Sequence, residues 1–166
     1  MRYRVFSILT GLLLAASFTT PGEAATPKVA SNPFDQLSGD WKGGGTVILK
    51  DNQPKRVTCQ ATYKPAGSKI TQTLRCTGDD YEINTNLKLT YKGGKIKGSW
   101  TESVYDASGG VTGTAKDNLI HAVIAGDKLR GRMSIKLSDA GHTINIVQFN
   151  EKSGTYRLAT SLSLHR

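Results

Sequence analysis

The spacing of two cysteines about a glycine-serine pair constrains this chain more than any other feature. Counting inward from Cys59 and Cys76, the sequence meets at Gly67-Ser68, a dipeptide suited to a type II′ hairpin because Gly takes the φ > 0 position. In that register Pro65 faces Ile70 at a non-hydrogen-bonded site, where Pro removes no ladder hydrogen bond. By the same alternation Cys59 faces Cys76 with Cα atoms about 4.5 Å apart, within the range of a disulfide. The sequence therefore predicts an oxidised β-hairpin.

The N-terminus has the pattern of a secretory signal peptide over residues 1–24. Two arginines precede an apolar run over residues 5–18, and small residues then lead to Ala24, after which we expect cleavage. A retained membrane anchor is the alternative, but the run is about 14 residues long against the roughly 20 that span a bilayer. Cleavage leaves 142 residues with a net charge of +8, which suits one domain. We expect a periplasmic or secreted protein, with residues 25–34 as an extended lead-in and residues 35–166 as the folded domain.

Tight-turn sequences divide the rest of the chain into strands that alternate apolar and polar residues. The Gly93-Gly94 turn, for example, pairs Thr85 with Glu102 and Ile83 with Val104. The expected strands are 41–50, 55–65, 69–77, 81–92, 95–105, 110–116, 119–125, 128–137, 142–150 and 155–165. Short connections and one apolar face per strand favour an all-β, antiparallel up-and-down meander of about ten strands. Closure of the meander into a soluble barrel removes its exposed edges.

A barrel of the outer-membrane type is the alternative to this soluble barrel. Such a barrel needs an apolar outer band with aromatic girdles. Here the polar face of nearly every strand carries Lys, Arg, Thr or Asn, and the apolar face is rich in Gly and Ala. The chain ends in Leu164-His165-Arg166, without the terminal aromatic residue of that class. We therefore expect a protein that is not embedded in a membrane.

The segment that opens the first strand resembles a superfamily signature. Leu37-Ser38-Gly39-Asp40-Trp41 is similar to the G-x-W signature of the calycins, which include lipocalins, fatty-acid-binding proteins and avidins. The resemblance implies that Trp41 closes the base of the barrel beneath a basic residue, here Arg166, and that the interior binds a small apolar molecule. Residues 39–45 are also similar to the start of nitrobindin-like haem barrels, which need an inward His on the last strand. Parity places His165 outward, so we expect no haem.

The inner wall is expected to carry many small residues. They are Gly43, Gly45, Gly98, Gly113, Gly131, Ala61, Ala115 and Ala122. They either leave a ligand cavity or relieve strain where the strands coil tightly, with Trp41, Trp100, Tyr63 and Met133 filling the space. The expected ligand contacts are Trp41, Tyr63, Gln72, Thr85, Trp100 and Glu102. Gln148 is a further inner polar candidate, and Leu158, Leu162 and Leu164 are expected to point inward.

Glu102 is an unusual residue for such a wall. The register points it inward opposite Thr85, and an unpaired buried carboxylate is costly. It is therefore expected to be protonated, to lie at a wet barrel mouth or to bind a polar ligand, unless a bulge near Thr101 turns it outward.

Sequence motifs of enzymes are lacking. His121, His142 and His165 lie far apart without metal-ligand spacing, and no G-x-S-x-G, P-loop or Rossmann pattern is present. A Ser-His-Asp arrangement assembled only in three dimensions stays open. Asp79-Asp80 is expected to form a turn rather than a hydrolytic carboxylate pair. We expect no catalytic residue, no cofactor and no metal site.

Basic residues mark a second candidate surface. Lys92 faces Lys95 across a hairpin tip, and Arg130 and Arg132 flank His121. Opposed like charges are unfavourable, so an anionic envelope component or an acidic protein is a candidate partner. The alternative is that a solvated hairpin tip tolerates the two lysines without a partner. Nucleic acid is not expected, because no stacking aromatics line these positions. Two hypotheses remain: an exported barrel that binds a small, largely apolar ligand, and an envelope interaction module or inhibitor that uses its loops and basic surface.

Overall fold

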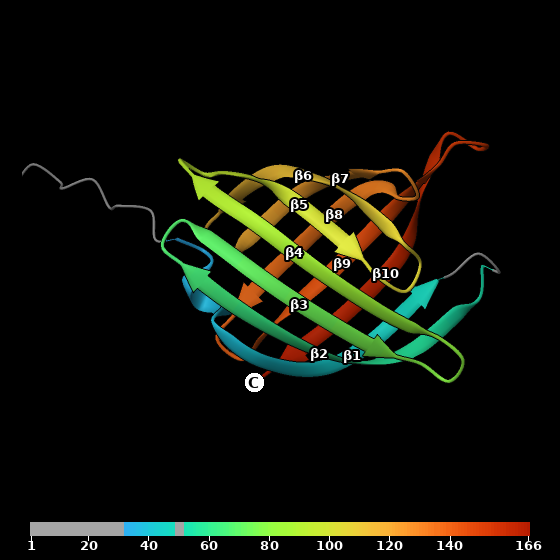
Figure 1. The fold of residues 1–166 in the computed structure, drawn as a ribbon, viewed down its shortest axis with the longest axis horizontal. Coiled ribbons are helices and arrows are strands. Elements are labelled where there is room, and N and C mark those ends of the chain that lie inside the picture. The colour runs from blue at the N-terminus through green and yellow to red at the C-terminus, as the bar shows by residue number, and fades with distance from the viewer. Residues whose placement is uncertain (1–31, 49–51) are drawn as a thin grey trace, which may run out of the picture.

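Ten antiparallel strands follow one another around a closed barrel (Figure 1). The computed structural model describes residues 32–48 and 52–166. Consecutive strands pair with each other, and the last strand pairs with the first to close the ring. The expected all-β meander and its closure are thus confirmed. The predicted signal peptide and residues 25–31 of the lead-in lie outside the described residues.

A short 3₁₀ turn, η1 (Asp35–Leu37), precedes the first strand. The strands are β1 (Gly39–Ile48), β2 (Pro54–Ala66), β3 (Lys69–Thr77), β4 (Glu82–Lys92), β5 (Lys95–Glu102), β6 (Ala107–Lys116), β7 (Leu119–Gly126), β8 (Arg130–Ser138), β9 (Gly141–Asn150) and β10 (Thr155–His165). These bounds agree with the expected ones to within a few residues at each end. Residues 49 and 50, expected at the end of the first strand, lie outside the described residues.

The hairpin between β2 and β3 has the register that the cysteine spacing predicts. Cys59 faces Cys76 with Cα atoms 4.1 Å apart, and the two form a disulfide. Pro65 faces Ile70 in the same ladder, and Gly67 has the positive φ of 57° that the turn requires. Because the bond restricts the unfolded chain, it stabilises the fold by about 3 kcal/mol. A disulfide is typical of proteins that function outside the reducing cytosol.

Burial alternates along the strands, so the core lies inside the ring. In β7 the side chains of Ile120, Ala122 and Ile124 are buried, whereas His121 and Val123 are exposed. The period of two is that of a sheet with one apolar face. Within the described part of the chain, no helix has the length and apolar character needed to cross a bilayer.

Two large apolar side chains expected on the inner wall are instead exposed to solvent. β5 ends at Glu102, so Val104 lies in the following turn, is 45% exposed and does not pair with Ile83. In β10 the register shifts between Leu158 and Thr160, and this bulge turns Leu158 to the outer face, where it is 47% exposed. Both predictions are wrong because strict alternation does not continue past a point where strand pairing becomes irregular.

The inner-wall glycines lie where neighbouring strands approach too closely for a side chain. A Cβ on Gly98 would overlap the carbonyl oxygen of Lys88 on β4, and one on Gly43 would overlap the carbonyl oxygen of Ser163 on β10. Glycine permits such approaches at the bends of a tightly coiled sheet. This geometry favours strain relief over cavity formation as the reason for these glycines.

Candidate functional site

One end of the barrel is closed by the residues that carry the calycin resemblance. The indole Nε1 of Trp41 donates a hydrogen bond to the carbonyl oxygen of Leu37 (2.8 Å), and both side chains are buried. The guanidinium of Arg166 lies over the Trp41 ring, 4.6 Å from its centroid. Arg166 also donates to the carbonyl oxygens of Gln36 and Ser38 at 3.2 and 3.3 Å. Arg166 therefore covers the tryptophan as the resemblance implies.

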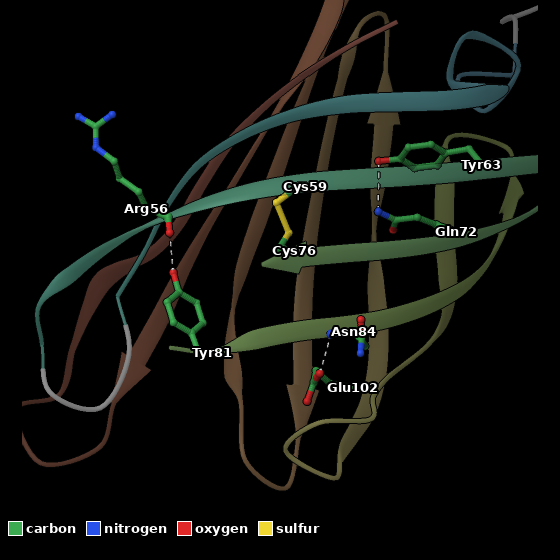
Figure 2. Close-up of a disulfide and its surroundings, with 8 residues drawn as sticks. All are labelled: Arg56, Cys59, Tyr63, Gln72, Cys76, Tyr81, Asn84 and Glu102. Carbon is green, nitrogen blue, oxygen red and sulfur yellow. Dashed lines mark hydrogen bonds between the residues drawn. A yellow bond between two sulfur atoms is a disulfide. The ribbon is translucent and has the colours of Figure 1, made fainter. Parts of the chain in front are cut away.

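A polar cluster lies just inside the closed end. Gln72 Nε2 donates to the hydroxyl of Tyr63 (3.2 Å; Figure 2), and that hydroxyl lies 2.9 Å from His142 Nε2. The His142 ring also packs edge-on against Trp41, with centroids 4.7 Å apart. The cluster brings together Trp41, Tyr63 and Gln72, three of the expected ligand contacts.

His142 is the inner-wall residue that sequence reasoning missed. It pairs with Leu137 on β8 and Leu164 on β10, both buried and inward, and is itself only 3% exposed. The sequence signal that could have found it is that His142 alternates in step with Ile144 and Ile146. The turn between β8 and β9 does not fix, however, whether these three residues face inward or outward. His165, by contrast, lies on the exposed outer face as expected.

Burial keeps this cluster uncharged at neutral pH. Desolvation lowers the pKa of His142 from 6.5 to about 4 and raises the pKa of Tyr63 above its ordinary value. Because the Tyr63 hydroxyl accepts from Gln72, its proton is available to His142 Nε2. The proton of the neutral imidazole then resides on Nδ1. The cluster therefore presents dipoles and an N–H donor rather than a charge.

Two buried N–H donors of the inner wall have no protein partner. Within residues 32–48 and 52–166, the buried side-chain atoms without a hydrogen bond are Trp100 Nε1 and His142 Nδ1. Trp100 is 6% exposed, and its ring covers Gly126, where an added Cβ would lie 2.9 Å from Cζ2. An unsatisfied buried donor costs about 1–3 kcal/mol, and such groups call for an explanation in a native fold.

Beyond the cluster, the inner wall is reached by solvent. At the Trp41 end, Pro65 and Tyr91 face inward and are half-buried. Further along the barrel, the half-buried residues that face inward include Leu74, Ile83, Thr85, Ile146, Gln148 and Thr160. Their cross-strand neighbours on the same face include fully buried residues: Leu74 faces Ala61, and Ile146 faces Met133. Leu74 and the other five residues of this second set lie further from the Trp41 end than the cluster does along the strands. Solvent therefore reaches the inner wall on the side away from Trp41.

Glu102 is held by the backbone at the accessible end. It faces Thr85, as the register predicts, and is 9% exposed. One carboxylate oxygen accepts from the backbone N–H groups of Asn84 (2.8 Å; Figure 2) and Val104 (3.1 Å), and the other accepts from Tyr105 (2.6 Å). Three donors satisfy the buried carboxylate without a ligand. Its geometry is that of a residue that ties the β5–β6 turn to β4, and ligand contact by Glu102 stays a prediction.

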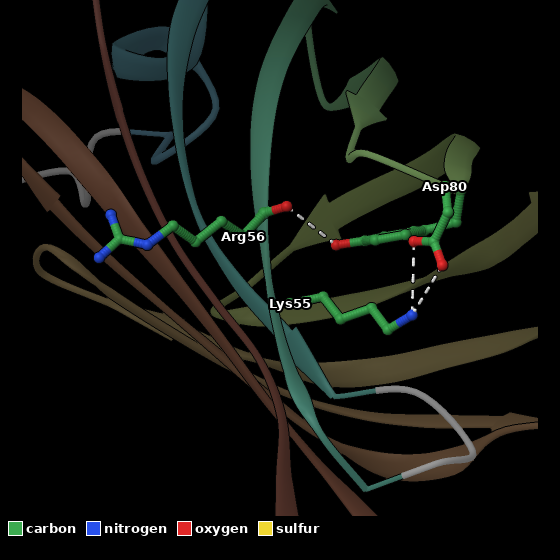
Figure 3. Close-up of polar contacts among 4 residues, drawn as sticks. Lys55, Arg56 and Asp80 are labelled. Atoms are coloured by element: carbon green, nitrogen blue, oxygen red, sulfur yellow. Dashed lines mark hydrogen bonds and ion pairs between the residues drawn. The ribbon is translucent and has the colours of Figure 1, made fainter.

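Asp79 and Asp80 lie in the connection between β3 and β4, in keeping with the expected turn. Lys55 Nζ contacts both carboxylate oxygens of Asp80, at 3.0 and 3.4 Å (Figure 3), and also lies over the ring of Tyr81. An open depression of about 650 Å³ adjoins this contact, and Thr58 and Asp79 are among its mainly polar lining residues. Such a surface is less suited to an apolar molecule than the barrel interior.

The predicted basic residues occupy two separate places on the outer face. Lys92 faces Lys95 at the β4–β5 tip, and both are exposed. Arg130 and Arg132 lie on β8, separated from β5 by two strands, and each has its guanidinium near an aromatic ring. The structure therefore does not join these four residues into one patch.

Comparison with known proteins identifies a shared fold. The sequence matches no protein-family model and no curated protein. Rv2717c from M. tuberculosis superposes with a TM-score of 0.66 at 12% identity, over 83% of this chain and 99% of that one. The S-type phycobiliprotein lyase CPES from Guillardia theta gives 0.55 at 16% identity, over 79% and 88% of the two chains. A DUF3598-family protein of unknown function from Nostoc punctiforme gives 0.55 at 17% identity, over 86% and 53%. These likenesses fit a calycin-like barrel fold. At such identities they show the fold alone.

Proposed function

We propose that this protein binds a small, largely apolar molecule inside the barrel. The observation that carries the proposal is the asymmetry of the interior. Trp41 is buried beneath Arg166 at one end, whereas inward aliphatic side chains further along the barrel, such as Leu74 and Ile146, are only partly buried. A concave, mainly apolar space with a few polar groups and one entrance is the usual form of a ligand site.

The chemistry of the wall favours an uncharged ligand. The half-buried inner residues are aliphatic or neutral polar, and His142 is neutral at physiological pH. The Glu102 carboxylate on this wall already accepts from three backbone N–H groups, so a charged ligand would lose hydration without meeting an unsatisfied opposite charge there. A carbonyl oxygen that reached Nδ1 of His142 or Nε1 of Trp100 would instead recover a hydrogen bond worth about 1 kcal/mol.

We propose a binding role without a catalytic step. A barrel of this shape belongs to a lyase in Guillardia theta, so the fold alone does not decide between binding and catalysis. In this chain His121 and His165 lie on the exposed outer face, and His142 is engaged by Tyr63. No group of three metal-ligating side chains gathers in the described residues. These placements support storage or transport of a ligand rather than its conversion.

We also propose that the protein acts in the periplasm or outside the cell. The disulfide between Cys59 and Cys76 supports an oxidising compartment, and the N-terminal sequence predicts export. Intact mass of the protein from its source cells should correspond to a chain that begins at Ala25. A mature protein that retains residues 1–24 would contradict this part of the proposal.

Native mass spectrometry of protein purified from its source cells tests the binding role. We expect a retained small molecule that is released on denaturation. Ile146→Trp should fill the accessible part of the interior and abolish retention, because Ile146 faces inward between β8 and β10. Asn145→Trp is the matched control, since the adjacent residue pairs with Ser134 and Ser161 on the outer side of the wall. An empty wild-type protein, or equal occupancy in both variants, would refute the proposal.

A further inference from the structure

An apolar patch interrupts the polar outer face of the barrel on β7, β9 and β10. It consists of Val123, Val147, Phe149, Tyr156 and Leu158, which we call the outer apolar patch. Val123 is 51% exposed, Tyr156 44% and Leu158 47%. Register joins them across the strands, since Val123 and Val147 both face Arg132, Leu158 faces Val147, and Tyr156 faces Phe149. Val147 and Phe149 are half-buried, and Arg132 lies between Val123 and the other four residues. Exposed apolar residues gathered in this way mark interaction sites.

A bulge in β10 places two of the five patch residues, Tyr156 and Leu158, on the outer face. Leu158 pairs with Val147, whereas Thr160 pairs with the next residue back along β9, Ile146. The extra residue, Ala159, returns Thr160 and the following leucines to the inner wall and leaves Leu158 and Tyr156 outside. Bulges that re-aim side chains are recurrent features of functional surfaces. A regular β10 would instead bury Leu158 in the core.

Two arginines are ordered on the aromatic rings of the patch. The Arg132 guanidinium lies 4.2 Å from the centroid of Tyr156, and that of Arg130 lies 6.0 Å from the centroid of Phe149. The two rings contact each other with centroids 5.2 Å apart. Stacking limits the rotamers of both arginines before a partner arrives, which lowers the entropy cost of binding. Arg130 also pairs with Glu151 at 3.6 Å, but both side chains are well exposed, so this contact is weak.

We propose that the outer apolar patch docks a protein partner whose apolar residues are flanked by carboxylates. Tyrosine and arginine are the residues enriched at binding hot spots, and lysine is depleted there. A guanidinium binds a carboxylate through two parallel hydrogen bonds, and the net charge, +9 for the full sequence and +8 after the predicted cleavage, steers an acidic partner toward it. A second copy of this chain fits less well, because a two-fold contact through this patch would place Arg130 and Arg132 of both copies in one interface.

Amide NMR spectra of the folded protein with three synthetic peptides test this inference. The peptides alternate leucine with glutamate, glutamine or lysine. We expect the glutamate peptide to shift resonances of β7–β10 and to bind about tenfold more tightly than the glutamine peptide. Arg132→Gln and Tyr156→Ser should each weaken its binding about tenfold. Lys92→Gln, which removes the same charge from another face, should leave the affinity unchanged.

Several outcomes would overturn the inference. They are no binding of the glutamate peptide, equal binding of the glutamine peptide, shifts outside β7–β10, or an equal loss in Lys92→Gln. Dimerisation in analytical ultracentrifugation that Tyr156→Ser abolishes would assign the patch to a second copy. Co-sedimentation with phosphatidylglycerol vesicles that depends on Tyr156 would assign it to a membrane. An unfolding curve for each variant separates these results from loss of the fold, and none of them depends on whether the interior holds a ligand.

Discussion

Acidification should destabilise this protein through one buried side chain, His142. The ring is 3% exposed and its pKa is lowered from 6.5 to about 4 by desolvation. Between these two values the unfolded chain binds a proton at this residue and the native protein does not. The free energy of unfolding therefore falls as the pH is lowered through this window, by up to about 1.4 kcal/mol per pH unit. The loss between about pH 7.5 and about pH 4.5 is about 2.5 kcal/mol, and the loss ends below the native pKa.

Urea unfolding at a series of pH values, followed by tryptophan fluorescence, measures this effect. Carboxylates and other groups also titrate over this range. The informative quantity is therefore the difference in free energy of unfolding between wild type and His142→Phe, because the contributions of those other groups cancel in that difference. Phenylalanine preserves a flat ring against Trp41 but has no proton to gain. We expect the free energy of unfolding of wild type, relative to that of His142→Phe, to fall by about 2.5 kcal/mol between about pH 7.5 and about pH 4.5. His121→Phe, on the exposed face of β7, is the control and should show no such change. Parallel curves for wild type and His142→Phe would refute the reasoning.

Three further predictions concern stability. Gly98→Ala should lower the free energy of unfolding by about 2 kcal/mol or more, because its Cβ would overlap a backbone carbonyl. A Cβ at Gly110 would have no atom nearer than 4.0 Å, so Gly110→Ala should be nearly neutral in the same urea titration. Equal effects of the two substitutions would contradict the steric argument. Glu102→Gln should cost about 1.5–3 kcal/mol, since it weakens charge-assisted bonds to three backbone N–H groups; unchanged unfolding would show that the turn does not need the carboxylate. Arg166→Ala should cost about 1 kcal/mol and alter the emission of Trp41, which it covers; an unaltered spectrum would argue against that contact in solution.

The strands and their register could be predicted because tight turns act locally. A two-residue loop fixes which residues face each other, so the pairing of Cys59 with Cys76 and of Thr85 with Glu102 follows from counting outward from Gly67 and Gly93. The same logic correctly predicts that Lys92 faces Lys95. Counting fails where the pairing is irregular. It does not detect the bulge that exposes Leu158, because a bulge inserts a residue without a distinctive sequence signal.

The sequence alone therefore determined a disulfide-linked, closed antiparallel barrel, since turn chemistry and alternation are short-range properties of the chain. Tertiary structure decided the rest, because those features depend on contacts between residues distant in sequence. It satisfied Glu102 with backbone donors from β4 and the β5–β6 turn, and placed His142 beside Tyr63. Each contact forms only when the barrel closes or when a turn adopts its final conformation. No local sequence pattern encodes the positions of these side chains relative to one another.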